Sequence, residues 1–243
     1  MKKILLFIAC CLFAIAYGQG SVRALGFTGD RVPMPGGGIP TEANPPAGVS
    51  ISHSFLNNRA EYTWEAWVFN QSNEESWVYG EGNPQLTFAV GLGPGVFYVA
   101  AHNEGVSPPW QLVSIPTGAA VPTNEWAHFA VTRRNNGTTT LYINGVQVAT
   151  GALHVQSHSA TSQAAIGINP GFTSQIDLPF RGIVDEVRIW NRALTEDEIR
   201  HKMTERLTGS EPGLAAYYRM DQDACPGADV CDASGQNNHG VRF

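Results

Sequence analysis

The stretch that decides the fold is residues 126–150, which read WAHFAVTRRNNGTTTLYINGVQVAT. Two turn signals divide it, and each contains an Asn-Gly pair, which supplies the positive φ angles that tight hairpin turns need. Outside the turns, apolar and polar residues alternate as they do in half-buried strands. The stretch therefore predicts a meander of three antiparallel strands, at residues 127–133, 138–143 and 146–150.

The rest of the chain between residues 60 and 190 continues this pattern of short alternating segments separated by turn residues, which is typical of antiparallel sheets. Residues 62–69 (YTWEAWVF) have aromatic side chains on both alternating faces, so we expect this strand to be covered on both sides. Residues 214–220 (LAAYYRM) predict another strand. Residues 33–46, with three consecutive glycines and five prolines, predict a long surface loop.

One helix stands out near the C-terminus. Thr195 and Glu198 have the spacing of a capping box, in which each side chain satisfies a free backbone donor of the other residue. An apolar stripe with a period of four follows, formed by Ile199, Met203 and Leu207. This stripe can lie on a sheet, and we expect Gly209 to end the helix.

Composition excludes several classes of protein. The chain has 243 residues, of which 43% are hydrophobic and 15% charged, which is ordinary for a globular protein and unlike a disordered or collagen-like chain. The net charge of −6 argues against binding to nucleic acid or to an anionic membrane. We find neither an internal repeat nor a linker, and therefore expect residues 19–243 to form one domain.

Residues 1–18 have the form of a secretory signal peptide. Lys2 and Lys3 form a basic segment, an apolar stretch runs from Ile4 to Ile15, and small residues precede the expected cleavage site before Gln19. The apolar stretch is too short to span a bilayer, which takes roughly 20 residues. Removal of the two lysines takes the net charge from −6 to −8. We expect a secreted or cell-surface protein that is not inserted in the membrane after cleavage.

Two of the four cysteines lie within the expected signal peptide. The other two, Cys225 and Cys231, flank the short segment Pro-Gly-Ala-Asp-Val. In an exported chain this pair is expected to form a disulfide, with a stabilisation of about 2 kcal/mol for so short a loop. A zinc site is the weaker interpretation, because the chain has no second cysteine pair and His239 alone does not complete a ligand set.

The order of several motifs resembles that of LamG-like modules, the jelly-roll domains of the concanavalin A-like lectin/glucanase group. The motifs are residues 24–30 (ALGFTGD), 65–68 (EAWV), 126–128 (WAH), 141–145 (LYING), 166–167 (IG) and, most specifically, 182–194 (GIVDEVRIWNRAL). The segments 213–221 and 232–240 resemble the closing segments of such modules in secreted bacterial surface proteins. The resemblance implies an all-β sandwich of two antiparallel sheets. Such modules usually continue beyond the last motif, so either the final strand ends at residues 241–243 or this chain is the first module of a longer protein, which we favour.

Catalytic motifs of this fold do not occur in the chain. Glucanases of the group share a strand motif of the type Glu-x-Asp-x-x-Glu, which aims carboxylates into one cleft, and no such run is present. Asp185 and Glu186 are adjacent, so strand alternation predicts that they point to opposite faces. We interpret these acids as structural ion-pair partners of nearby arginines, and we expect no enzymatic activity.

Calcium is the metal that the resemblance suggests, because related jelly rolls often hold one hard cation with oxygen ligands. Pentraxins bind calcium through acids that follow a strand corresponding to residues 164–168, but here Asn169, Pro170 and Gly171 occupy those positions. Glucanase-like members place a structural ion between the first and last strands. Asp30 and Asp221 lie at corresponding places in this sequence. That they bind calcium and that they are merely solvated aspartates in loops are equally favoured interpretations.

Sugar binding requires exposed aromatic rings together with a few polar groups. Five aromatic residues are candidates, namely Trp67, Trp77, Tyr79, Trp110 and Tyr142. Alternation places Trp77 and Tyr79 on one strand face opposite Val78. Each aromatic residue is more often part of a core than a binding platform; Trp110, in the loop 107–110, is the one expected to be exposed.

These observations favour a secreted, non-catalytic β-sandwich module that binds extracellular glycan or another ligand, with a structural calcium as a further expectation. The alternative is a spacer or adhesion module that contacts proteins through its loops. A polysaccharide-degrading enzyme is the least favoured hypothesis. The ligand and the oligomeric state are not readable from the sequence.

Overall fold

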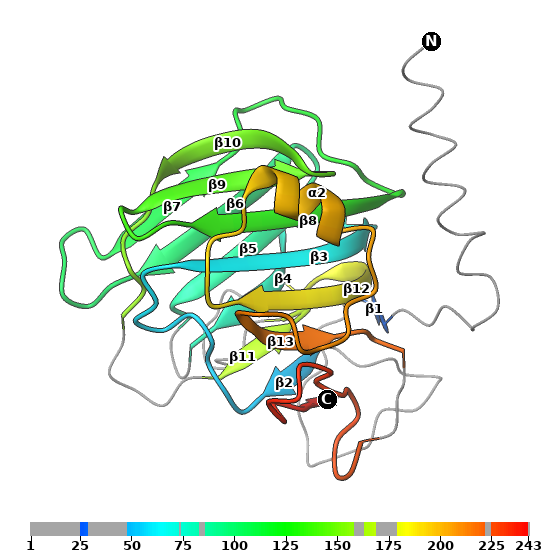
Figure 1. The fold of residues 1–243 in the computed structure, drawn as a ribbon. Coiled ribbons are helices and arrows are strands. Elements are labelled where there is room, and N and C mark those ends of the chain that lie inside the picture. The colour runs from blue at the N-terminus through cyan, green and yellow to red at the C-terminus, as the bar shows by residue number, and fades with distance from the viewer. Residues whose placement is uncertain are drawn as a thin grey trace, which may run out of the picture.

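The computed structural model describes residues 25–28, 48–72, 74–82, 86–157, 163–168, 179–221 and 225–242. Within these residues, fourteen strands and one helix form a sandwich of two antiparallel sheets, each with seven strands (Figure 1). The predicted all-β sandwich is therefore confirmed. The predicted signal peptide and the predicted loop at residues 33–46 lie outside the described residues.

Sheet A carries the predicted meander at one edge. In spatial order it contains β1 (Leu25–Thr28), β12 (Arg181–Trp190), β3 (Tyr62–Asn70), β8 (Trp126–Arg133), β9 (Thr138–Ile143) and β10 (Val146–Ala152), and β13 (Leu214–Tyr218) also pairs with β12. Asn144 and Gly145 both have positive φ, of 50° and 71°, as a two-residue hairpin turn requires. The three-strand meander is confirmed.

Sheet B packs behind sheet A. In spatial order it contains β14 (Gly240–Arg242), β2 (Val49–Ile51), β11 (Ala164–Ile166), β4 (Ser76–Glu81), β5 (Phe88–Gly93), β6 (Val96–His102) and β7 (Trp110–Ser114). Strands β7 and β10 lie at the same end of the sandwich, each as the last strand of its sheet (Figure 1).

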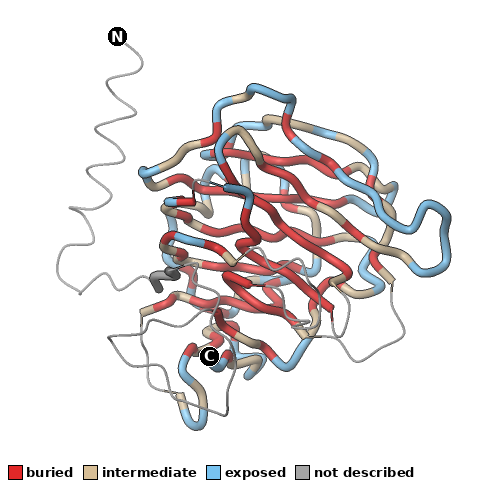
Figure 2. The backbone as a smooth tube through the Cα atoms, turned by 180° about the vertical axis from the view of Figure 1, so that it is seen from behind, coloured by how far each residue is buried: buried red, intermediate tan, exposed pale blue. Residues whose placement is uncertain are grey.

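The core fills the space between the sheets, and buried residues run along the strands while exposed residues gather in the connections (Figure 2). Strand β3 contributes Trp64, Ala66 and Val68 to this core. Phe97 of sheet B and Phe129 of sheet A meet edge to face, with ring centroids 5.2 Å apart. Burial of these apolar side chains, which fix the spacing of the two sheets, is the main stabilising contribution.

The predicted helix forms with the predicted cap but ends earlier than expected. In α2 (Glu196–Lys202) the Glu198 backbone N–H donates to the Thr195 hydroxyl at 3.2 Å, and the Thr195 N–H donates to the Glu198 carboxylate at 2.9 Å. The chain leaves the helix after Lys202, so the expectation that Gly209 ends it is wrong. Leu207 still packs in the same apolar cluster as Ile199, but from the segment that follows the helix.

Among the described residues, no helix has the length and apolar character needed to cross a membrane.

Candidate functional site

The outer face of sheet A is covered by α2 and the segments around it. Ile199, Leu194 and Leu207 pack on Trp190, Tyr217, Tyr142 and Ala130, and together these residues form an apolar cluster on this side of the sheet. The cover formed by α2 and its flanking segments also binds Trp67 of β3 through the Met203 carbonyl, so this strand is covered on both sides, as predicted. It also leaves little of the centre of this face open to a ligand.

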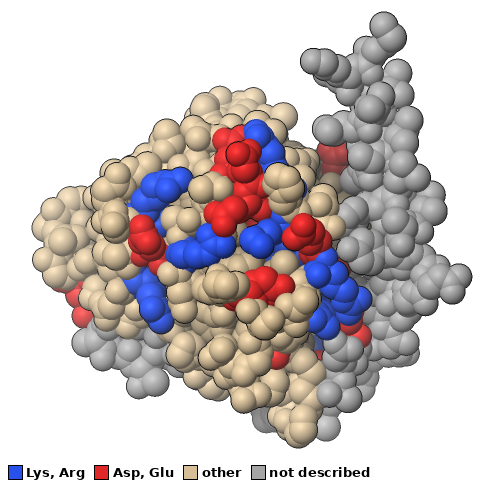
Figure 3. Space-filling model, viewed as in Figure 1, with Lys and Arg blue, Asp and Glu red and all other residues tan. Residues whose placement is uncertain are grey.

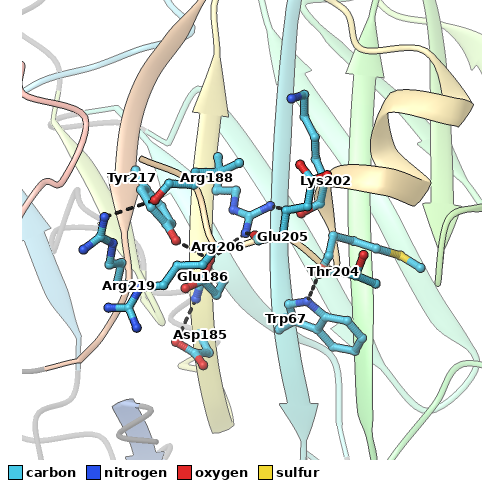
Figure 4. A network of polar contacts seen from close by, with 12 residues as sticks. Trp67, Asp185, Glu186, Arg188, Lys202, Thr204, Glu205, Arg206, Tyr217 and Arg219 are labelled. Carbon is cyan, nitrogen blue, oxygen red and sulfur yellow. Dashed lines mark hydrogen bonds and ion pairs between the residues drawn. The ribbon is translucent and has the colours of Figure 1, made fainter. Parts of the chain in front are cut away.

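Arg188 of β12 fastens the end of α2 to sheet A (Figure 4). Its guanidinium donates to the carbonyl oxygens of Lys202 and Glu205, each at 2.6 Å. The Trp67 indole of β3 donates to the carbonyl of Met203 at 2.8 Å. The last turn of a helix leaves carbonyl oxygens without partners inside the helix. Side chains from two strands thus bind the carbonyl of Lys202, the last residue of α2, and those of Met203 and Glu205 just after it, and they hold the chain that leaves the helix against sheet A.

Two carboxylates balance the charge of Arg188, which is only 1% exposed. Glu186 lies 2.6 Å from the guanidinium and also accepts a hydrogen bond from the Tyr217 hydroxyl at 2.6 Å. The fully buried Glu65 lies 3.7 Å from the guanidinium. The predicted pairing with nearby arginines is confirmed for Glu186, which binds Arg188. The same prediction for Asp185 is wrong, since the pKa of that carboxyl is raised to about 8 and it forms no ion pair among the described residues.

Glu65 has further partners from two other strands. Its carboxylate lies 3.4 Å from the His128 imidazole and accepts a hydrogen bond from the Trp190 indole at 3.0 Å. Burial raises the pKa of Glu65, but the hydrogen bonds and positive charges of its partners outweigh burial and hold its pKa below the ordinary value. Glu65 is therefore an ionised structural group whose surroundings do not suit a general acid.

A β-bulge in β12 corrects the expectation that Asp185 and Glu186 point to opposite faces. Val184 and Val187 both lie in the sandwich core, so two residues rather than one stand between successive inward positions. Glu186 has a positive φ of 52°, and its backbone N–H donates to the Asp185 carboxylate at 2.9 Å. The bulge therefore places both acids on the outer face of sheet A (Figure 4).

Asp185 is unusual among these acids. Burial and then the negative charge of Glu186 raise its pKa to about 8. Its carboxyl thus holds a proton at neutral pH. Glu65 and Glu186 both form ion pairs with Arg188. These acids are therefore part of a network that positions the helix, and they do not form an exposed acid–base pair.

The described residues do not provide a set of ligands for the predicted calcium ion. Asp221 forms an ion pair with Arg206 at 2.7 Å, so its charge already has a partner. Asp30 lies outside the described residues. Within the parts of the chain that are described, no group of three His, Cys, Asp or Glu residues has a geometry for holding a metal ion. Asp221 alone does not constitute a site, and calcium stays a proposal from the sequence.

Two of the predicted aromatic candidates lie on the outer face of sheet A, beneath or beside α2. Tyr142 is 4% exposed and belongs to the apolar cluster under the helix. Trp67 is half-buried, with its ring against His128 at a centroid distance of 5.6 Å and its indole N–H bound to Met203. Both rings serve the packing of the helix, and Tyr142 offers no open ring face.

Alternation predicted that Trp77 and Tyr79 share one face of their strand, and this prediction is wrong. A bulge in β4 shifts the register against β5 between these residues, and Tyr79 turns into the core, fully buried, with its hydroxyl on Glu81 at 2.6 Å. Trp77 packs with Tyr98 on the other side of sheet B and donates to its hydroxyl at 2.7 Å. Trp77 is only 8% exposed.

Trp110 is the candidate that the structure leaves open, as expected. It is 43% exposed and begins β7, the edge strand of sheet B. The His102 ring of β6 lies beside it at a centroid distance of 5.0 Å. Leu112, two residues on, is 57% exposed, and Val106 in the preceding loop is 44% exposed. Sequence reasoning missed these neighbours, although the alternation of Trp110 with Leu112 was the available signal for an exposed edge strand.

The hydrogen-bond pattern shows which backbone groups of β7 face the open edge. Asn103 donates to the Pro109 carbonyl and Ile115 donates to the Phe97 carbonyl, so odd-numbered residues bond across the β6–β7 pair. Residues alternate between bonded and non-bonded positions in an antiparallel ladder. The backbone N–H and C=O of Trp110 and Leu112 therefore point away from β6, to the edge where no described strand pairs.

The predicted disulfide between Cys225 and Cys231 is present, with Cα atoms 5.6 Å apart. It closes a short loop that leads into β14, where Val230 and Gly240 exchange backbone hydrogen bonds at 3.0 and 2.8 Å. The adjoining Asp232 accepts hydrogen bonds from the backbone of Tyr217 and Ser234. Disulfides are typical of proteins that fold in oxidising compartments.

The family is shown by the sequence. Residues 46–200 match the model of the concanavalin A-like lectin/glucanase superfamily. The chain belongs to this superfamily, so the resemblance drawn from the motifs is confirmed. No curated protein matches the sequence significantly.

Solved structures share the fold. A candidate carbohydrate binding protein from Bacteroides ovatus matches with a TM-score of 0.63 and 20% identity, over 80% of this chain and 55% of that one. A heptameric SAP-like pentraxin from Limulus polyphemus matches with a TM-score of 0.53 and 15% identity, over 73% and 79%. The CBM40 module of the Ruminococcus gnavus IT-sialidase, bound to α2,3-sialyllactose, matches with a TM-score of 0.51 and 15% identity, over 64% and 91%. At these identities the likeness shows the fold alone.

Proposed function

We propose that this protein is a secreted, non-catalytic module that binds glycan at the open edge of sheet B, with Trp110 as its aromatic platform. The observation that carries the proposal is the exposed ring of Trp110, which His102 supports from the neighbouring strand. The apolar face of a sugar ring stacks well on an indole, because the contact buries a large rigid surface. The superfamily and the names of the two carbohydrate-binding neighbours support the proposal.

The surrounding groups suit a sugar as well. Binding sites for small ligands combine apolar surface with a few polar groups that orient the ligand. At β7 these polar groups are the outward backbone N–H and C=O of Trp110 and Leu112 and the hydroxyl of the exposed Ser114. Sugar hydroxyls both donate and accept hydrogen bonds, so they match such mixed groups.

The experiment is a glycan array followed by titration calorimetry with the full chain. Trp110→Ala is expected to weaken binding about tenfold or more, because a tryptophan at the centre of a contact commonly contributes more than about 1.4 kcal/mol. Trp126→Ala is the matched control, because Trp126 is also partly exposed but lies in sheet A and packs on Phe69. A folded wild-type protein that binds no glycan contradicts the proposal.

The same proposal includes two further statements: the protein is exported, and it does not catalyse a reaction. We expect no release of reducing sugar from polysaccharides, because the acids Glu65 and Glu186 are held by Arg188. We expect the exported protein to begin at Gln19, which mass spectrometry of the secreted form measures. Sugar release would identify an enzyme instead.

An adhesion module is the second candidate, and one observation favours it. Val106 and Leu112 add aliphatic surface beside an open strand edge, and such an edge can pair with a strand of another protein. The glycan array separates the two functions, because a protein-binding module gives no glycan signal.

A further inference from the structure

We infer that the ligand of the β7 edge is a neutral glycan chain, without carboxylate, sulfate or phosphate groups, that runs along the strand across Trp110 and Leu112. This inference rests on the proposed glycan binding and adds the chemical class of the ligand. Two observations carry it, the absence of Lys and Arg from the strands around β7 and the arrangement of apolar and polar groups along β7 itself.

The chain around β7 contains neither Lys nor Arg, since residues 60–132 have none, and the basic side chain beside Trp110 is that of His102. In the described strands of sheet B, Arg242 of β14 is the one Lys or Arg residue, and β14 is at the opposite edge of the sheet from β7. The carboxylates on this side are Glu104 in the loop before β7 and Glu75, which accepts a hydrogen bond from Tyr98. The exposed Arg59 lies in the loop before β3, not on β6 or β7. An anionic sugar on β7 would therefore find no Lys or Arg partner on β6 or β7.

The opposite sheet supplies no cation from its nearby strands either. Residues 135–176, which include β9 and β10, contain no Asp, Glu, Lys or Arg. Arg133 is buried, and its guanidinium donates to the carbonyls of Leu153 and Ala60. Arg134 lies in the β8–β9 turn of sheet A. Charged residues of both signs gather instead over α2 and β12, on the outer face of sheet A that points away from sheet B (Figure 3).

Electrostatics then decides the class of glycan. Desolvating a carboxylate or sulfate without an ionic partner costs several kcal/mol, whereas a hydroxyl needs only a neutral hydrogen-bond partner. The net charge, which is −6 for the full chain and −8 after removal of Lys2 and Lys3, adds long-range repulsion of anions. The outward backbone groups of Trp110 and Leu112 and the Ser114 hydroxyl are neutral donors and acceptors, which suit hydroxyl groups.

The geometry along β7 favours a chain over a single sugar. Trp110, Leu112 and Ser114 share one face of the strand, and alternate residues are about 7 Å apart. A sugar ring stacked on Trp110 therefore ends near Leu112, where a second ring continues the contact. The outward backbone groups follow the same spacing, so hydrogen bonds and apolar contacts repeat together along the strand.

The test is binding of the full chain to two sets of soluble polysaccharides, at low and at high salt. The neutral set contains a β-glucan, a mannan and an arabinan, and the anionic set contains polygalacturonate, chondroitin sulfate and polysialic acid. We expect binding to a neutral polymer with a Kd that changes less than about twofold between roughly 0.01 and 1 M salt, where the screening length shrinks about tenfold. Trp110→Ala is expected to weaken it about tenfold and Leu112→Ala about threefold, with Trp126→Ala unchanged.

The outcomes separate this inference from the proposed function. Binding only to anionic polymers, weakened by salt, overturns the neutral class and leaves glycan binding standing. Binding to a neutral polymer that Trp110→Ala does not weaken overturns the location at β7. Binding to none of the polymers, by protein shown to be folded, overturns the proposed function and this inference with it.

Discussion

Replacement of Asp185 by asparagine tests the polar network of sheet A most directly. In the folded protein, burial and the adjacent Glu186 raise the pKa of Asp185 to about 8, from the ordinary value of 3.8. The folded state therefore keeps a proton that the unfolded chain releases. Stability attributed to this group is fully present below the unfolded pKa of 3.8 and is lost as pH rises towards 8. The asparagine side chain carries no titrating proton, so the variant does not show this loss.

The size of the effect follows from linkage. Each pH unit between the two pKa values changes the free energy of unfolding by about 1.4 kcal/mol. From pH 5 to pH 7 the free energy of unfolding of the wild type is thus expected to fall by about 2 to 3 kcal/mol through Asp185. If water reaches the carboxyl and screens its charge, the expected fall is about 1 kcal/mol. The amide oxygen of the asparagine retains an acceptor for the Glu186 backbone N–H, which donates to Asp185 at 2.9 Å in the wild type.

The assay is urea unfolding followed by tryptophan fluorescence at pH 5, 6, 7 and 8. The difference in unfolding free energy between Asp185→Asn and wild type is expected to move in favour of the variant as pH rises, since other titrating groups cancel in the difference. Asp197→Asn is the control, because that side chain is 84% exposed at the start of α2. A difference that stays constant from pH 5 to pH 8 would refute the assignment of a proton to Asp185.

Three further predictions concern other parts of the fold. Glu65→Ala is expected to destabilise the protein by about 3 to 5 kcal/mol in urea unfolding, because it leaves Arg188 partly uncompensated and two other donors unpaired; a loss below about 1 kcal/mol would show that the network is not needed for stability. Reduction of the Cys225–Cys231 disulfide, or Cys225→Ser, is expected to lower stability by about 2 kcal/mol, as measured by thermal unfolding with and without reductant; an unchanged Tm contradicts this. If the proposed calcium site exists, calcium raises the Tm relative to EDTA and Asp221→Ala abolishes the rise; equal Tm values in calcium and EDTA remove the site.

The parts of the fold that follow local rules were predictable from the sequence. The meander depends on Asn-Gly turns and on alternation within short segments, and the start of α2 depends on two side chains three residues apart. Each rule involves neighbours in the chain, so the sequence contains the relevant information. The disulfide likewise joins the two cysteines that remain after the expected signal peptide.

The predictions that proved wrong concern features that depend on contacts between segments far apart in the sequence. The bulges in β4 and β12 break the alternation that placed Tyr79 and Glu186, and nothing within either segment indicated the extra residue. Gly209 does not end the helix, because the chain already leaves it after Lys202, where Arg188 of β12 and Trp67 of β3 bind the carbonyls of Lys202 and Met203. Of the predicted aromatic platforms, Trp110 is exposed, whereas Tyr142 is covered by a helix from elsewhere in the chain.

The place of β12 in sheet A constrains the order in which the protein folds. This strand lies between β1 and β3, which precede it by more than a hundred residues, and it also carries the arginine that holds α2. While the chain is being synthesised, β3 therefore lacks a neighbour on one side until residue 190 has emerged. Such long-range pairing slows folding, and α2, with seven residues, is too short to persist alone. The centre of sheet A and its helix should thus form together and late, and should gain protection from hydrogen exchange in one step.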